Sequence, residues 1–287
     1  MNSECLLKSI ENLSLLEIDL SPIRDLEKTR IDCILLALSG VTGFNIELDE
    51  IDTFHKAIEE ARKLSNSSGR VFHEPYLKVT FTLDHRFEIG NENLNQVKSK
   101  IKVALDKKIN ILEISPTDTE EEVLINILDF INDISEDQLI SLHTNRVFKS
   151  NAHLVNRTKE AFDKFGSRLL LNVDGATQSN KSDTYDQTIQ TIATADILTK
   201  DLKVKEKRKY KKLPIYLSGD INKKTTGLAK LCGIDFCGLS VSADIITSLN
   251  AYDHSKGIKD SSYIENQLPF IVNELEYFKN LDSKTNE

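Results

Sequence analysis

The sequence of 287 residues predicts a single (β/α)8 barrel of the α/β class, a TIM barrel preceded by a short extra N-terminal helix. Two observations favour this fold. Short apolar runs of strand length alternate with longer segments of helical periodicity, and the alternation repeats through eight units. Strict alternation is typical of parallel strands joined by right-handed crossovers, and closing eight units into a barrel removes the exposed sheet edges. An open doubly wound sheet is the alternative.

The expected strands are short runs of apolar residues. They span residues 13–20, 43–48, 76–83, 109–114, 139–144, 168–173, 213–217 and 236–241. The segments between them carry apolar residues at the i, i+3, i+4 spacing of a helix face. Expected helices span residues 23–38, 52–64, 94–105, 152–165, 224–231 and 264–278, with a further long helix that starts near Ser182 or Asp183.

Local signals mark several helix ends. Gly40 and Gly166 follow apolar helical segments, as glycines do just beyond a helix C-terminus. Residues 66–69 (NSSG) have the composition of a loop. Asp118 or Thr119 is expected to cap a helix whose first turn, residues 120–122, is wholly acidic and therefore suits the helix dipole.

Composition is that of one globular domain. Hydrophobic residues make up 39% and charged residues 29% of the chain, and no linker-like segment separates the units. We therefore expect residues 1–287 to form one domain, with residues 1–12 as an N-terminal extension and residues 281–287 as a frayed tail. The net charge of −8 argues against a general nucleic-acid binder.

Targeting and cysteine signals are few. No run approaches the roughly 18 apolar residues of a membrane span, and the first residues lack the basic and apolar regions of a secretory signal. The four cysteines include no C-x-x-C pair, which argues against a zinc site or an iron–sulfur cluster. These features predict a protein of the reducing cytoplasm without membrane contact.

Polar residues recur where the expected strands end, which in such barrels is the face that carries active sites. Period-2 alternation places His143 on one face of the fifth strand and Asp174 on one face of the sixth. If both faces point inward, His143 and Asp174 converge with Glu113 near the end of the fourth strand. This trio is the candidate catalytic group, suited to acid–base chemistry or to a divalent metal. Satisfied hydrogen bonds inside the barrel are the structural alternative.

A second set of strand-end residues is expected to bind a substrate anion. The segments LPIYLSGDIN and CGLSVSADI resemble the ends of strands seven and eight in phosphate-binding barrels, where glycines expose backbone N–H groups to the anion. Gly219 and Gly238 match those glycines, whereas Ser242 replaces a second glycine, and its Cβ hinders the closest approach. The candidate anion-binding residues are Asn145, Asn172, Gly175, Ser218, Gly219, Asp220, Gly238, Ser240 and Ser242.

Other chemistries are disfavoured. Lys78 lies early in the third strand, away from the presumed active end, so a Schiff-base aldolase is not expected. The nucleotide-binding and hydrolase glycine motifs are absent. The cofactor, if one is needed, is unknown.

One strongly basic run, KVKEKRKYKK, extends from Lys203 to Lys212, just before the seventh strand. We interpret it as a solvated helix C-terminus on the face of the barrel opposite the active site. The alternative is a docking patch for an acidic protein partner. The acidic net charge and the aromatic content of 7% argue against nucleic acid.

Several short motifs in the second half of the chain resemble the C-terminal domain of the LdpA (light-dependent period) family. They are DGATQS, with Asp174, Gly175 and Ser179; LSGDIN, with Gly219 and Asn222; and the final GLSVSADI. The ILEIS segment around Glu113 sits in the corresponding place, and residues 30–48 give a fainter match. The resemblance implies a barrel with redox or circadian signalling. That family's iron–sulfur cysteine insert is absent here, so clusters are not carried over.

Two functions follow. The first is an enzyme of lyase or isomerase type that acts on a small anionic metabolite, phosphorylated ones included. The second is a non-catalytic, LdpA-like regulatory barrel that docks a protein partner through residues 203–212.

Overall fold

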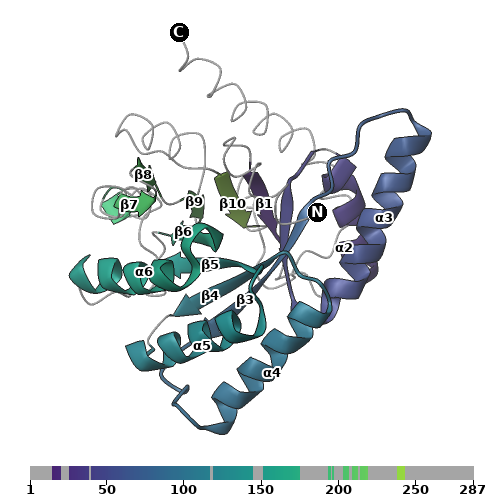
Figure 1. The fold of residues 1–287 in the computed structure, drawn as a ribbon. Helices are drawn as coiled ribbons and strands as arrows, with labels where there is room; N and C mark the ends of the chain where they lie inside the picture. Colours follow the sequence, from purple (N-terminus) through teal and green to yellow (C-terminus); the bar gives the residue numbers. More distant parts are fainter. Residues whose placement is uncertain are drawn as a thin grey trace, which may run out of the picture.

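A computed structural model describes residues 15–20, 26–38, 40–116, 119–144, 151–174, 193–194, 196, 203–206, 209–212, 214–218 and 238–242. Eight parallel strands form a closed ring in the order β1-β10-β9-β6-β5-β4-β3-β2 (Figure 1). The strands are β1 (Leu15–Asp19), β2 (Gly43–Ile46), β3 (Tyr76–Leu83), β4 (Ile111–Pro116), β5 (Leu139–Thr144), β6 (Leu169–Asp174), β9 (Ile215–Ser218) and β10 (Gly238–Ser242).

The parallel α/β barrel predicted from the alternation of strands and helices is confirmed for these residues. The helices of the described residues lie around the outside of strands β1 to β6 (Figure 1). They are α2 (Leu26–Leu38), α3 (Ile51–Ser67), α4 (Glu92–Asp106), α5 (Glu121–Ile134) and α6 (Asn151–Phe165), with short 3₁₀ turns η1 (Leu48–Glu50) and η2 (Gly166–Arg168). Of the long helix expected after β6, only residues 193–194 and 196 are described, and they are helical. The expected N-terminal helix, the helices after β9 and β10, and the tail 281–287 lie outside the described residues.

The side chains of each barrel strand point alternately toward the helices and into the barrel. In β3, Leu77, Val79 and Leu83 are buried in the hydrophobic layer between strands and helices. Similarly, Phe44 of β2 contacts Phe54 of α3, with ring centroids 5.8 Å apart. Because side chains alternate along a strand, the residues between these apolar positions point into the barrel. That inward set is mostly polar, and it forms the site described below.

Two expected helix boundaries are wrong. Helix α3 continues through Asn66 and Ser67, which we expected in a loop, because serine hydroxyls satisfy its last carbonyls: Ser67 Oγ donates to Leu64 O at 2.8 Å. The chain leaves the helix at Gly69, with φ of +69°. Glu120, rather than Asp118 or Thr119, is the N-cap of α5, and no side-chain capping bond is formed. Gly40 and Gly166 do follow helices with positive φ, as expected.

The basic run is not a helix end. Its residues form an antiparallel pair, β7 (Lys203–Glu206) and β8 (Lys209–Lys212), which is a sheet separate from the barrel ring. Two features favour a hairpin over a helix. Val204 and Tyr210 have high β-propensity, and the register sets Glu206 opposite Lys209 as a complementary pair. The expectation of a helix C-terminus failed because charge composition alone does not distinguish the two conformations.

Candidate active site in the barrel

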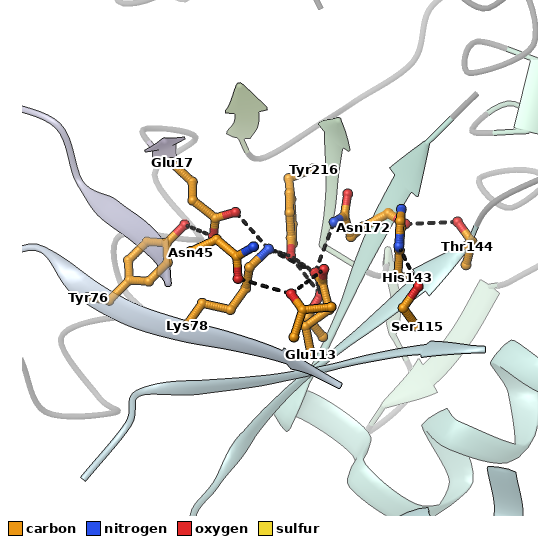
Figure 2. Close-up of polar contacts among 12 residues, drawn as sticks. Glu17, Asn45, Tyr76, Lys78, Glu113, Ser115, His143, Thr144, Asn172 and Tyr216 are labelled. Atoms are coloured by element: carbon orange, nitrogen blue, oxygen red, sulfur yellow. Dashed lines mark hydrogen bonds and ion pairs between the residues drawn. The ribbon is translucent and has the colours of Figure 1, made fainter. Parts of the chain in front are cut away.

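Glu113 of β4 is the centre of a buried polar cluster inside the barrel (Figure 2). Its Oε2 accepts hydrogen bonds from Lys78 Nζ (2.9 Å), Ser141 Oγ (2.7 Å), Asn172 Nδ2 (2.9 Å) and Tyr216 OH (2.5 Å). Burial raises the pKa of Glu113, but Lys78, then His143 and the Tyr216 hydrogen bond, outweigh it and bring the pKa to about 2. Glu113 is therefore a carboxylate at neutral pH, held by donors from four strands.

Lys78 of β3 joins this carboxylate to a second one. Its Nζ lies 2.6 Å from Glu17 Oε1 and 2.9 Å from Glu113 Oε2, and only 1% of the lysine side chain is exposed. Burial lowers the pKa of Lys78, yet Glu113 and Glu17 outweigh burial and hold it above its usual value. Tyr76 OH donates to Glu17 Oε2 at 3.0 Å. The lysine is thus a fixed ammonium, which is incompatible with attack as a neutral amine.

Tyr216 of β9 also belongs to the buried polar cluster around Glu113. Its hydroxyl lies 3.1 Å from Lys78 Nζ and 2.6 Å from Ser141 Oγ. Burial, followed by the charges of Glu113 and Glu17, raises the pKa of Tyr216 well above its usual value. The hydroxyl therefore stays protonated and serves as a donor.

His143 and Ser115 lie nearer the C-terminal ends of their strands. Ser115 Oγ is 2.8 Å from His143 Nδ1, and the histidine is partly exposed whereas the serine is buried. Thr144 Oγ1 donates to the backbone carbonyl of Asn172 at 3.0 Å, which ties β5 to β6. A partly exposed imidazole in contact with a hydroxyl can transfer protons, because its ordinary pKa is near neutrality.

The members of the predicted catalytic trio, Glu113, His143 and Asp174, lie at different heights along the barrel axis. Glu113 lies within the buried cluster, one inward position before Ser115 on the same strand, and His143 contacts Ser115. Asp174 is placed by its backbone register, opposite Ser218 of β9. The contacts of Glu113 and His143 place both side chains inside the barrel, whereas for Asp174 only the backbone position is described. Sequence analysis predicted that His143 and Asp174 converge with Glu113. In the described contacts, His143 instead meets Ser115, and Glu113 meets donors from four strands.

The predicted anion-binding residues fall into two groups. Asn172 and Ser218 are buried on neighbouring strands, and Asn172 bonds directly to Glu113. In β10, the register pairs Gly238 with Tyr216, Ser240 with Glu17 and Ser242 with Asp19. Asn145, Gly175, Gly219 and Asp220 lie outside the described residues.

Several members of the cluster were not predicted, among them Glu17, Tyr76, Lys78, Thr80 and Tyr216. Each is a polar or amphipathic residue at an inward position of a strand, where it alternates with apolar residues, such as Lys78 in YLKVTFTL. That placement was the available signal, since a buried lysine in a strand needs paired charges.

Glu50, also not predicted, lies in the connection between β2 and α3, on the side where β2 ends. Its side chain is buried, and Glu50 Oε2 accepts from the backbone N–H of Glu47 at 3.3 Å. Burial raises the pKa of Glu50 to about 7, helped by the charges of Asp49 and Glu47 and opposed by the Glu47 hydrogen bond. It is a carboxyl group able to exchange protons near neutral pH.

No metal-binding group is present in the described part of the chain, where no three His, Cys, Asp or Glu side chains cluster suitably. No helix within the described ranges is long and apolar enough to cross a membrane.

Comparison with known proteins shows the fold alone. No family model and no curated protein matches the chain. Among solved structures, Rhizobium etli pyruvate carboxylase with acetyl coenzyme A aligns with a TM-score of 0.53 and 11% identity over 97% of this chain. The carboxyl transferase domain of that enzyme with pyruvate aligns with a TM-score of 0.51 and 13% identity over 96% of this chain. A Rubisco from Pyrococcus horikoshii, in complex with a sulfate ion, gives a TM-score of 0.52 and 9% identity over 97%.

This chain spans only part of those proteins. It covers 28% and 50% of the two carboxylase chains and 66% of the Rubisco chain. The shared feature is the parallel α/β barrel.

Proposed function

We propose that this chain is an enzyme of lyase or isomerase type that acts on a small anionic metabolite, phosphorylated ones included, at the C-terminal ends of the barrel strands. The observation that carries the proposal is the contact between His143, which is partly exposed, and the buried Ser115, nearer the C-terminal ends of the strands than the Lys78–Glu113 cluster. Lyases and isomerases of this kind need a group that moves a proton next to a carbonyl, and an imidazole is the side chain best suited to do so at neutral pH.

In this proposal His143 is the acid–base group, and Asp174 assists it from the neighbouring strand. Glu113 has a different role from the acid–base one predicted from sequence. With a pKa of about 2 it remains ionised, and four donors occupy its Oε2. We assign Glu113 to positioning. It holds the side-chain amide of Asn172, the residue that pairs with His143 on the neighbouring strand.

The substrate anion is assigned to the rim formed by β9 and β10. These strands are adjacent, and Gly238 pairs with Tyr216, so the segments that follow both strands start from one side of the barrel. Gly219, Asp220, Ser240 and Ser242 are the proposed contacts there, with Asn145 and Gly175 from the segments after β5 and β6. Two structural neighbours are described with pyruvate and with sulfate, which agrees with an anion as substrate.

The test is exchange of carbon-bound protons with solvent, a step shared by both reaction types. The full chain is incubated in D2O with pyruvate or dihydroxyacetone phosphate, and loss of the proton signal is followed by NMR. We expect His143→Gln to slow the exchange by about 10²- to 10⁴-fold with little change in melting temperature. His73→Gln, in the exposed segment before β3, is the matched control and should retain the wild-type rate.

Two outcomes would contradict this proposal. Exchange in His143→Gln within twofold of wild type would remove the acid–base role. A large fall in melting temperature for that variant would instead assign His143 to structure.

The alternative is an LdpA-like regulatory barrel that docks a protein partner through the β7–β8 hairpin. The observation that favours it is that this strongly basic hairpin lies outside the barrel ring. A partner that binds the wild-type chain but not a variant with Lys203, Lys205, Lys209 and Lys212 changed to Gln would support it, provided that His143→Gln binds normally. If the His143 variant also fails to bind, the hairpin is not the docking site.

A further inference from the structure

Two polar atoms on one wall of the barrel are buried without a hydrogen-bond partner among the described residues. They are Asn172 Oδ1 of β6 and Ser218 Oγ of β9, in residues that are 3% and 7% exposed. More than nine in ten buried polar groups in proteins are paired, because an unpaired one loses its hydration without compensation. Two such atoms on adjacent strands indicate a place for a ligand group.

The orientation of the Asn172 amide is fixed by its neighbour. Glu113 is ionised and can only accept, so the amide must direct Nδ2 toward Glu113 Oε2, at 2.9 Å. The carbonyl oxygen of Asn172 therefore points away from the carboxylate, as Figure 2 shows. It presents an acceptor that cannot be exchanged for a donor by rotating the amide.

The strand register brings both atoms to the side of His143. Asn172 pairs with His143 on one side and with Tyr216 on the other. Tyr216 points inward, since its hydroxyl reaches Glu113, and Ser218 shares its face two residues further along β9. Asn172 Oδ1 and Ser218 Oγ thus lie on the inward face, toward the end of the barrel where His143 lies.

Charge decides which ligand group fits. The ion network beside Asn172 contains two carboxylates, Glu17 and Glu113, against the single ammonium of Lys78. This excess of negative charge repels an anionic group and favours one that donates hydrogen bonds. A donor also satisfies Asn172 Oδ1, and Ser218 Oγ, two residues beyond the Tyr216 that pairs with Asn172, can accept from a ligand or donate to it.

We propose that Asn172 and Ser218 form a subsite for a hydrogen-bond donor of the substrate, a hydroxyl or protonated amino group on a carbon next to the one that His143 deprotonates. This inference rests on the proposed function and narrows its substrate class to small anions that also carry such a donor. The anionic group of the substrate is then bound away from the Glu17–Lys78–Glu113 network.

Pairs of small carboxylates and phosphates, with and without a hydrogen-bond donor, test the subsite. Binding of L-lactate is compared with propionate, L-alanine with propionate, and glycerol phosphate with propyl phosphate, by titration calorimetry on the full chain. We expect at least one donor-bearing probe to bind about tenfold or more tightly than its partner, because a site built for a donor rejects the analogue without it. Equal affinity within every pair, or no binding of any probe, would overturn the subsite.

Two serine variants separate ligand binding from structure. Ser218→Ala should reduce the ratio of the affinities for the donor-bearing probe and its partner to about twofold or less. The melting temperature of the free protein should stay unchanged or rise, because an unpaired buried hydroxyl has been removed. Ser141→Ala is the matched control on β5, and it should lower the melting temperature, since Ser141 bonds to Glu113 and Tyr216. An unchanged preference in Ser218→Ala would overturn the assignment.

The two experiments distinguish failure of the proposed reaction from failure of the proposed subsite. Donor preference without proton exchange would remove the lyase or isomerase function and leave the subsite. Proton exchange without donor preference would remove the subsite and leave the function.

Discussion

At the scale of single residues, the main feature is a charge network in a place where barrels usually hold apolar side chains. Transferring an ion from water to a protein interior costs several kcal/mol, and the cost is recovered only through close partners. Lys78 meets this condition with two carboxylates, and Glu113 meets it with donors from β3, β5, β6 and β9. Removal of one partner leaves an ion buried without full compensation.

Glu113→Gln is therefore expected to lower the free energy of unfolding by about 3–5 kcal/mol. The amide keeps the size of the carboxyl but removes the charge that opposes Lys78. Urea unfolding at pH 7 measures the loss. Glu59→Gln is the control, because Glu59 is exposed on α3 and forms a solvent-exposed pair with Lys63, so we expect little change in the free energy of unfolding.

The same substitution should alter the response to acid. The pKa of Glu113 is lowered from 4.5 to about 2 in the folded protein, so its contribution to stability is present above pH 4.5 and is lost as the pH falls toward 2. Glu113→Gln should thus show a shallower fall in unfolding free energy over this range than wild type. Parallel profiles for the two proteins would contradict the assigned pKa.

At the scale of elements, the packing of β2 against β3 depends on the absence of a side chain at Gly43. A Cβ on Gly43 would lie 2.1 Å from Tyr76 Cζ, well inside van der Waals contact, and the Tyr76 hydroxyl holds Glu17. The absence of a side chain at the start of β2 therefore allows the ring to lie across the barrel and reach β1.

Gly43→Ala should destabilise the protein by about 1–3 kcal/mol, because the ring of Tyr76 must move from a packed position. Thermal unfolding measures the effect. In a double-mutant cycle with Tyr76→Leu, the two losses should be less than additive, since the smaller side chain leaves room for the Cβ. Additive losses would mean that the cost of Gly43→Ala arises elsewhere.

Also at this scale, the elements that sequence analysis predicted best have clear local signals. The bounds of β3 and β5 agree with prediction, whereas β4 begins two residues later than expected, at Ile111. Lys203–Lys212 was predicted wrongly because its structure depends on pairing between two short strands. The inward faces of β5 and β6 were also predicted from alternation, together with His143 and Asn172.

The contacts inside the barrel were beyond prediction because they depend on closure. Lys78 and Tyr216 are 138 positions apart, and they meet only when the strand order and register are known. Alternation identifies which residues face inward. It does not tell which of them lie at the same height, and that height separates Glu113 from the His143–Ser115 pair.

At the scale of the whole molecule, closure joins the beginning of the barrel to its end. Strand β10 pairs with β1 from Leu15–Gly238 to Asp19–Ser242, and it pairs with β9 on its other side. The wall that carries Glu17 therefore depends on a strand more than 200 positions later in the chain. Without this pairing, β1 and β9 would both present open edges.

Leu239→Pro tests this dependence, because Leu239 pairs with both Leu16 and Leu217 and proline removes a ladder hydrogen bond from a central strand. We expect loss of the single cooperative unfolding transition, or aggregation, as monitored by circular dichroism and light scattering. A chain that ends after residue 280 is the control, and it should unfold like wild type if residues 281–287 are a frayed tail. Since closure is also what places Glu17 beside Lys78, an unchanged cooperative transition in Leu239→Pro would show that residues 238–242 do not complete the ring on which the interior network depends.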